Sequence, residues 1–193
     1  MVQEHHLFVV SGPSGVGKDS VVKKLRANHP EIAKTISATT RAPREGEKDG
    51  VDYFFCTEEK FKQLVADDQI VEHNLYSGNY YGTLRSEVER NLSDGKFVVL
   101  VIDVHGAANI KRLYPRANTI FLLPPSVEVL ESRLRGRGTE TEDSVRRRLA
   151  EAKAELAIKD TFDSRVVNND IDVCAQELYS VIADLAKRGD SAQ

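Results

Sequence analysis

A glycine-rich run near the N-terminus has the residue types and the spacing of a phosphate-binding loop. It reads GPSGVGKDS and consists of Gly12, Pro13, Ser14, Gly15, Val16, Gly17, Lys18, Asp19 and Ser20. Glycines allow the backbone to curl so that successive N–H groups point at phosphate oxygens, and a following helix adds its positive end. Lys18 can then reach the outer phosphates of a nucleoside triphosphate. A glycine-rich turn with an unrelated lysine is the alternative, which the position between a strand and a helix disfavours.

Asp19 departs from the usual loop pattern, in which a hydroxyl that contacts Mg²⁺ follows the lysine. The Asp19 carboxylate either approaches the metal through water or faces away while Ser20 supplies a hydroxyl one position later. Negative charge beside phosphates is unfavourable, whereas a carboxylate in the first turn of a helix is favourable. Electrostatics leaves both arrangements open, and we select Ser20 as the predicted Mg²⁺ ligand.

Two arginines and two tyrosines further along have the chemistry of a second phosphate site. Arg41 and Arg44 are three positions apart with a proline between them, so both guanidinium groups can hold one phosphate from a turn. The phenols of Tyr53 and Tyr81 offer hydrogen-bond donors to the same phosphate. A solvated charge run and ordinary core packing of the tyrosines are the alternatives for each residue taken alone.

Three other polar residues have the chemistry needed to bind a purine base. Ser37, Glu72 and Thr83 bring one carboxylate and two hydroxyls. This set complements an edge with N–H donors and a carbonyl acceptor, which describes guanine. These three residues are therefore suited to binding a guanine base.

Short apolar runs predict the strands that position these groups. Parallel, buried strands are expected at 7–10, 97–102 and 119–123, with a shorter candidate at 166–167. Helical spacing follows each run: after the glycine loop, after Gly106, after Ser126 as a helix N-cap, and from about 171 to 185. This alternation predicts an α/β fold with a parallel sheet flanked by helices.

Two segments break the alternation. Residues 37–90 combine short strand-like runs, a helix-like stretch at 58–66 and an aromatic turn, which predicts a small mixed β unit inserted into the core. The polar, glycine-rich run around residue 136 separates two helices, a composition that is typical of a mobile lid. The polar tail at 187–193 is expected to fray.

Composition limits the class of protein. The 193 residues carry a formal net charge of −3, so the global basic field typical of nucleic-acid binding is absent. No signal peptide or long apolar span is evident, which predicts a cytoplasmic protein with no membrane or nucleic-acid partner. Cys56 and Cys174 match no metal or disulfide pattern. His5, His6 and His29 are expected at the surface, and His73 behind the base pocket. The sequence does not indicate the oligomeric state.

Several motifs, in order and in register, give the chain a specific resemblance. The runs GPSGVGK, TTR-x-PR-x-GE, DYFF, GNYYGT, IDVHGA, LPPS and RLRGRGTETE, followed by RRRLA, resemble guanylate kinase from about Leu7 to Tyr179. The resemblance implies a single domain over 1–193, with a core at about 1–36, 91–125 and 160–193. It also implies a GMP-binding insert at about 37–90 and a lid region at about 126–159.

The resemblance implies roles for individual residues. The GMP-binding residues would be Ser37, Arg41, Arg44, Tyr53, Glu72, Tyr81, Thr83 and Asp103. Besides the glycine loop, ATP would contact Arg133, Arg137, Asn168 and Asn169, although the two asparagines also suit a turn. The residues that stabilise the transferring phosphoryl group would be Lys18, Arg44, Arg137 and Arg148. Arg135, Arg146 and Arg147 are expected to be solvated or salt-bridged.

The implied activity is the transfer of the γ-phosphoryl group of ATP to GMP, with Mg²⁺ as cofactor and ATP and GMP as small-molecule partners. One alternative is a guanylate kinase-like binding module without activity, a class that typically lacks the complete glycine loop and lysine. The other is a ribose bisphosphate phosphokinase, which GKDS also resembles, but such an enzyme would not need Ser37, Glu72, Tyr81 and Thr83. At 105 and 101 the family often has glutamine and a second acid, where this chain has His105 and Val101.

Overall fold

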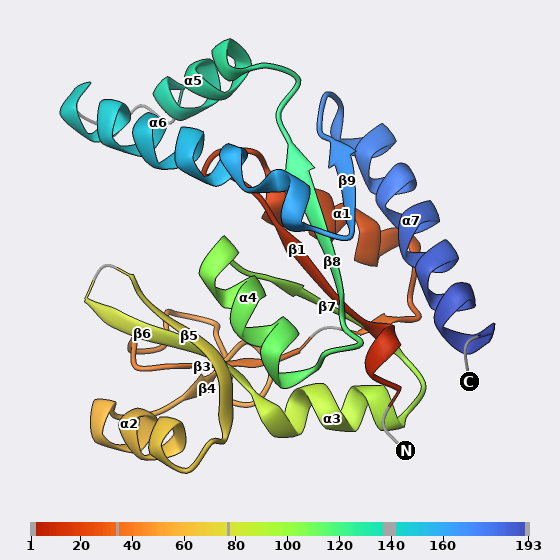
Figure 1. Ribbon diagram of the computed structural model, residues 1–193. Helices are drawn as coiled ribbons and strands as arrows, with labels where there is room; N and C mark the ends of the chain where they lie inside the picture. Colours follow the sequence, from red (N-terminus) through yellow and green to blue (C-terminus); the bar gives the residue numbers. More distant parts are fainter. Residues whose placement is uncertain (1–2, 34, 77, 137–141, 192–193) are drawn as a thin grey trace.

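The computed structural model describes residues 3–33, 35–76, 78–136 and 142–191. Its central feature is a parallel sheet of five strands in the order β2-β7-β1-β8-β9 (Figure 1). These strands are β1 (Leu7–Ser11), β2 (Ile32–Ala33), β7 (Phe97–Val101), β8 (Asn118–Leu123) and β9 (Ser164–Val167). The predicted α/β fold with a parallel sheet is therefore confirmed.

Helices cover both faces of the parallel sheet, as the apolar character of β1 requires. Phe8 and Val10 point to one face, where they pack in a core with α1 (Lys18–Asn28) and α7 (Ile171–Ser191). Leu7 and Val9 point to the other face, against α3 (Arg85–Ser93) and α4 (Val104–Leu113). This arrangement buries β1 on both sides and fixes the loop that leaves its carboxyl end.

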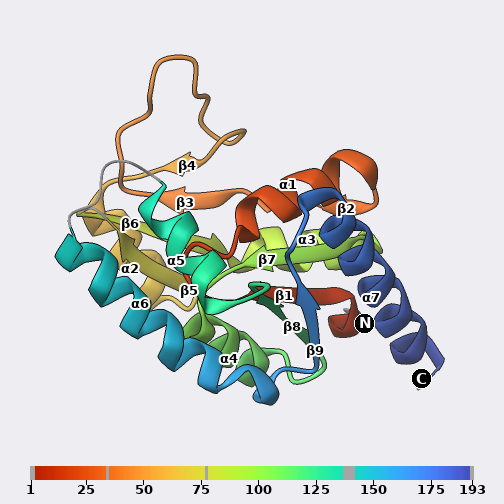
Figure 2. The same cartoon turned by 90° about the horizontal axis from the view of Figure 1, so that it is seen from above.

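A second sheet lies beside the first and is formed by the segment between β2 and α3. It has the order β4-β3-β6-β5, with β3 (Ser37–Thr39), β4 (Phe54–Phe55), β5 (Ile70–Tyr76) and β6 (Asn79–Leu84). β3 is parallel to β4 and antiparallel to β6, so the sheet is mixed as predicted. Helix α2 (Glu58–Ala66) packs on it through buried Phe61, and the loop from β3 to β4 projects outward (Figure 2).

Two further helices lie over the glycine loop, above the carboxyl ends of the central strands (Figure 1). These are α5 (Val127–Arg135) and α6 (Glu142–Ala157), after which the short 3-10 helix η2 (Lys159–Thr161) leads into β9. The predicted N-cap of α5 is confirmed, because the Val129 N–H donates to Ser126 Oγ over 3.3 Å. Arg137 lies outside the described residues.

Both ends of the chain differ from the prediction. His5 and His6, expected at the surface, are 3% and 8% exposed in the 3-10 helix η1 (Glu4–His6). The segment 187–191, expected to fray, continues α7. The reason is a close contact, because a Cβ on Gly189 would lie 2.5 Å from the His5 ring, so only glycine lets the helix end pack there. Asp190 then accepts a hydrogen bond from His5 at 2.7 Å.

Three further expectations need smaller corrections. Helix α4 begins at Val104 rather than after Gly106, because the Asp103 carboxylate caps it by accepting the Gly106 N–H at 2.8 Å. His73 is exposed, with its ring centroid 6.1 Å from that of Phe61 on α2, rather than packed behind the base pocket. His29 is half-buried, stacked on Tyr179 with ring centroids 3.5 Å apart.

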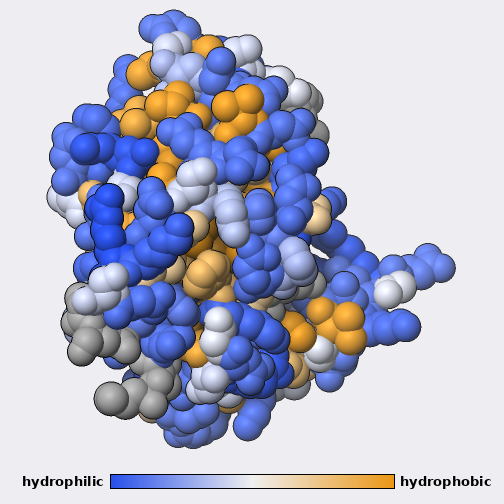
Figure 3. All heavy atoms as spheres, turned by 90° about the vertical axis from the view of Figure 1, so that its right-hand side faces the viewer, coloured by the Kyte–Doolittle hydropathy of each residue, from blue (hydrophilic) through white to orange (hydrophobic). Residues whose placement is uncertain are grey.

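Figure 3 shows an apolar area among hydrophilic side chains on the face that carries α7. Val167, Ile171 and Val173, where β9 passes into α7, are 45%, 45% and 66% exposed.

In the part of the chain that the structure describes, no helix is long and apolar enough to cross a bilayer.

Candidate active site

A polar pocket of about 260 Å³ joins the glycine loop to the mixed sheet. Its lining includes seven of the residues selected from the sequence: Lys18, Asp19, Ser37, Glu72, Tyr81, Thr83 and Asp103. A cation that can bind phosphate and a carboxylate that can bind a base therefore face one space. An apolar cavity of about 450 Å³ lies between α4 and η2, but none of the predicted site residues lines it.

The loop from 12 to 17 has the curled backbone that phosphate binding requires. Gly12 and Gly17 have φ of +141° and +97°, in the left-handed region that favours glycine. A Cβ on Gly12 would also lie 2.4 Å from the Leu122 carbonyl oxygen, so glycine is needed there for space as well. Helix α1 starts directly after the loop, at Lys18. Lys18 Nζ donates to the Gly12 and Pro13 carbonyls at 2.5 and 3.3 Å, which holds the ammonium group over the loop.

Asn168 supports the loop from behind. Its side chain is 2% exposed, and Nδ2 donates to the Val16 carbonyl at 2.7 Å. Arg133, from α5, donates to the same carbonyl at 3.3 Å and to the Asn168 carbonyl at 3.0 Å. These bonds tie α5, β9 and the loop together. The structure thus places Asn168 and Arg133 at the glycine loop, while Asn169 is exposed beside them.

Helix α6 brings two side chains to the other side of the loop. Arg148 Nη2 donates to Ser14 Oγ at 2.6 Å. Glu155 lies near Lys18 and the Ser14 backbone, and its Oε2 is buried without a hydrogen-bond partner among the described residues. Burial is the main cause of a raised pKa of Glu155, which Lys18 partly opposes. The arginine was predicted, whereas the glutamate was not.

Residues from three neighbouring strands form a row on the mixed sheet. In the strand register, Thr83 on β6 pairs with Ser37 on β3 and with Glu72 on β5. Two hydroxyls and a carboxylate, from residues that span 46 positions of the chain, therefore lie side by side. The same sheet brings Tyr81 next to Asn74, which also lines the pocket and was not predicted.

Glu72, the carboxylate of this row, has a strongly shifted pKa. Burial raises its pKa to about 7, and the negative charge of Asp103 contributes to the increase. The first turn of α4 lies against Glu72, since a Cβ on Gly106 would lie 2.9 Å from Glu72 Cγ. The start of α4, which belongs to the IDVHGA motif, thus packs against the part of the pocket that contains Glu72.

The predicted second phosphate site lies in the projecting loop. Arg41 Nη2 forms an ion pair with Glu47 Oε1 at 2.8 Å, and its guanidinium carbon lies 5.4 Å from the centre of the Tyr53 ring. The other oxygen of Glu47 accepts the Arg44 backbone N–H at 2.7 Å. One carboxylate thus fixes both arginine positions, and the rings of Tyr53 and Tyr81 are 6.0 Å apart. Arg41, Arg44 and Tyr53 do not line the pocket described above.

Comparison with known proteins agrees with this site. The sequence profile described as "Guanylate kinase" matches residues 4–185. A guanylate kinase from Synechocystis sp. is 48% identical over 178 residues, which cover 92% of this chain and 93% of that protein. The chain belongs to the guanylate kinase family. A guanylate kinase from Gloeobacter violaceus is 49% identical over 84% of this chain and 80% of its own.

Solved structures place the fold in the same family. The crystal structure of guanylate kinase from Anaplasma phagocytophilum has a TM-score of 0.69 and 34% identity, over 92% of this chain and 84% of that chain. None of these similarities favours the inactive binding module or the ribose bisphosphate phosphokinase.

In this guanylate kinase family member, sequence reasoning missed Glu47 and Glu155. Glu47 was visible as the acid in PR-x-GE, but this motif does not indicate what the side chain contacts, and Glu155 lies in no motif that singles it out. The surface arginine predicted at 135 is confirmed, with ion pairs to Glu131 and Glu142.

The site offers oxygen ligands of the kind that Mg²⁺ prefers. Asp19 and Asp103 both line the pocket with Lys18, whereas the exposed Ser20 side chain does not. Carboxylates and a hydroxyl beside a phosphate loop fit the ion that the family implies, and the choice between Asp19 and Ser20 stays a prediction.

Proposed function

We propose that this protein transfers the γ-phosphoryl group of ATP to GMP and releases ADP and GDP. The observation that carries this proposal is the pocket shared by Lys18 and the row of Ser37, Glu72 and Thr83. Such a pocket can hold the phosphates of the donor and the base of the acceptor at the same time.

Guanine recognition is assigned to the row on the mixed sheet. An ionised Glu72 accepts hydrogen bonds from the N–H groups of guanine, while Ser37 and Thr83 complete the polar edge. Adenine lacks this pattern of donors, so AMP would leave the buried carboxylate without partners.

The acceptor phosphate is assigned to Arg41, Arg44, Tyr53 and Tyr81, with Asp103 between the two substrates. An oxygen of this phosphate attacks the γ-phosphorus of ATP. The new O–P bond forms as the bond from the γ-phosphorus to the oxygen that stays with ADP breaks. The attacking oxygen is already anionic, so no general base is needed.

The donor side is assigned to the glycine loop from Gly12 to Ser20, with Arg133, Asn168 and Asn169 around it. Charge that develops on the transferring group is stabilised by Lys18, Arg44, Arg137 and Arg148, because catalysis of this reaction rests on positioning and electrostatics. Mg²⁺, held by Ser20 with the acidic residues nearby, would neutralise charge on the ATP phosphates.

We further propose that the chain works as one domain with moving parts: a core, the insert at about 37–90 and the lid at about 126–159. Closure of the insert and lid over both substrates would exclude water and suppress ATP hydrolysis. We expect the protein to act in the cytoplasm.

An acceptor screen with purified protein tests this proposal. ADP formation is measured in a coupled assay with ATP, Mg²⁺ and GMP, AMP, UMP or CMP in turn. We expect GMP to be used much faster than the other three. ADP formation that does not depend on GMP would refute the assignment, and binding of GMP without turnover would identify an inactive binding module.

A further inference from the structure

The two ends of the chain meet in a cluster of metal-ligand side chains, at the opposite end of strand β1 from the phosphate loop. His5, His6 and Asp190 each offer one ligand atom, and these atoms all lie within 4.8 Å of one another. His5 Nε2 lies 2.7 Å and His6 Nε2 3.4 Å from Asp190 Oδ1. The rings of the two histidines meet edge to face, with centroids 4.5 Å apart.

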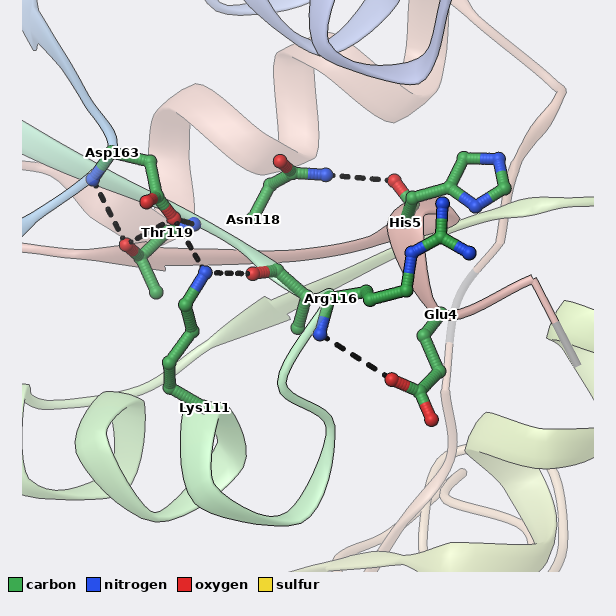
Figure 4. A network of polar contacts seen from close by, with 8 residues as sticks. Glu4, His5, Lys111, Arg116, Asn118, Thr119 and Asp163 are labelled. Carbon is green, nitrogen blue, oxygen red and sulfur yellow. Dashed lines mark hydrogen bonds and ion pairs between the residues drawn. The ribbon is translucent and has the colours of Figure 1, made fainter. Parts of the chain in front are cut away.

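The cluster is built into the fold. The His5 backbone carbonyl accepts a hydrogen bond of 2.7 Å from Asn118 Nδ2, which anchors η1 to strand β8 (Figure 4). His6 packs edge-on against Phe97 of β7, with ring centroids 4.9 Å apart. Gly189 lets the end of α7 lie directly against the His5 ring. Strand β8, strand β7 and the end of α7 therefore each fix one part of the cluster.

The polar atoms of this cluster are incompletely satisfied. His6 is 8% exposed, and neither of its ring nitrogens has a hydrogen-bond partner among the residues that the structure describes. Leaving a buried polar atom unpaired is costly, and imidazole nitrogen is a preferred ligand of Zn²⁺ and similar ions. The unpaired Nε2 of His6 lies beside the Asp190 carboxylate, where a bound ion could use both atoms.

We propose that His5, His6 and Asp190 form a binding site for a divalent transition-metal ion such as Zn²⁺. Two nitrogens and one oxygen are three of the four ligands of a tetrahedral site, and the 53% exposure of the Asp190 side chain leaves room for water as the fourth. Ligand atoms in such a site are about 3.3 Å apart, from Zn–ligand distances of about 2.0 Å. The distances from Asp190 Oδ1 to the two histidine nitrogens, 2.7 and 3.4 Å, lie on either side of this value. All three ligand atoms lie within 4.8 Å of one another, so the side chains must close by up to about 1.5 Å around the ion.

The surrounding charges indicate which kind of ion the site would select. Arg116 lies beside His5 (Figure 4), and its Nη2 donates to the Gly189 carbonyl at 3.3 Å; Lys187 and Arg188 precede Asp190 on α7. These cations oppose long-range attraction of a metal ion, while the Glu4 carboxylate, which accepts the Arg116 backbone N–H at 3.4 Å, offsets part of their charge. The negative end of α7 partly offsets them. Binding must therefore depend on direct ligation by imidazole, which favours Zn²⁺, Co²⁺ or Ni²⁺ over Mg²⁺ and Ca²⁺.

The proposal can be tested on untagged protein that has been stripped with a chelator. Equilibrium dialysis against Zn²⁺ in excess Mg²⁺ should give one bound Zn²⁺ per chain, and Co²⁺ should give the visible absorption bands of a tetrahedral complex. At a free Zn²⁺ concentration of a hundred times Kd, we expect the Tm to rise by about 5–10 °C. Failure of the wild-type protein to bind Zn²⁺ or Co²⁺ would overturn the proposal.

Matched variants distinguish this site from others in the chain. His6→Gln and Asp190→Asn should each lose the bound ion and the rise in Tm, whereas His105→Gln, at an exposed histidine on α4, should keep both. Asp190 is exposed, so its variant tests the site even if His6→Gln does not fold. Equal Zn²⁺ binding by wild-type protein and Asp190→Asn would place the ion elsewhere and contradict the assignment.

Discussion

The carboxylates of Glu72 and Asp103 line the same pocket, and the charge of Asp103 adds to burial in raising the pKa of Glu72 to about 7. The carboxylate assigned to guanine therefore changes its charge within the physiological range. A protonated Glu72 can accept fewer hydrogen bonds from the base, so pH should control acceptor binding.

We expect the KM for GMP to rise as pH falls below about 7, by up to about tenfold per pH unit, while the KM for ATP changes less. Steady-state kinetics at a series of pH values measures this. The GMP phosphate itself titrates near pH 6, so Glu72→Gln serves as the control that retains only the phosphate effect. An identical pH dependence in wild type and Glu72→Gln would contradict the role of Glu72.

The same residue should affect stability. Its folded pKa of about 7 lies above the ordinary value of 4.5, so the native state holds the proton more tightly and stability falls as pH rises through this window. Glu72→Gln should raise the free energy of unfolding by about 1–3 kcal/mol above pH 7 and have little effect near pH 4. Urea unfolding at both pH values measures the difference, and equal shifts at both would refute this explanation.

Glu47 should act on the acceptor through the two arginines. Glu47→Ala removes the ion pair with Arg41 and the bond to the Arg44 backbone. We expect a several-fold increase in the KM for GMP, with the KM for ATP unchanged, because only the acceptor phosphate uses this loop. The matched control is Glu45→Ala, an exposed acid two positions earlier. Similar effects of both substitutions would show that general charge, and not these contacts, is responsible.

Asn168 should support ATP binding indirectly. Asn168→Ala leaves the Val16 carbonyl without its 2.7 Å bond, and a lost buried hydrogen bond costs about 1–3 kcal/mol. We expect lower stability and a higher KM for ATP, measured by denaturation and kinetics. Asn169→Ala, at the exposed neighbour, should change stability by less than about 0.5 kcal/mol. If only Asn169→Ala lowered stability and raised the KM for ATP, then Asn169, and not Asn168, would be the residue that supports ATP binding.

The Mg²⁺ ligand can be identified by comparing two neighbours. Ser20→Ala should raise the Mg²⁺ concentration needed for half-maximal activity and lower kcat, because the predicted hydroxyl ligand is lost. Asp19→Ser restores the usual loop and should retain activity at saturating Mg²⁺. If Asp19→Ser loses more activity than Ser20→Ala, the carboxylate is the ligand and our selection of Ser20 is wrong.

Local patterns were sufficient for much of the fold. Helix α2 begins at Glu58 and ends at Ala66, the bounds expected from spacing alone, and β1, β7, β8 and β9 match the predicted apolar runs. The two-residue edge strand β2 was not predicted. The pocket residues from Lys18 to Asp103 could be selected because their chemistry is specific. Their side-by-side position on β3, β5 and β6 depends on strand register, which sequence spacing does not reveal.

The errors have a common physical cause. His5 and His6 were expected at the surface and the tail at 187–193 was expected to fray, because these polar residues lie near the chain ends. Their burial results from a contact between residues about 185 positions apart, which no local pattern records. Glu155 was missed for the same reason, since it lies near Lys18, far away in the sequence. Glu47 was missed although its partners Arg41 and Arg44 are only six and three positions away, because the sequence motif does not show which side chains it contacts.

The sequence separation of the paired strands also favours one order of folding. β1 pairs with β7 and β8, whose residues lie about ninety to 110 positions later, whereas the mixed sheet is completed within residues 37–84. Contacts close in sequence form sooner than distant ones. As the chain leaves the ribosome, the mixed sheet can assemble before β7 and β8, the strands that flank β1 and the phosphate loop, have been synthesised. We therefore expect the half of the protein assigned to the base to form before the half assigned to the phosphate donor.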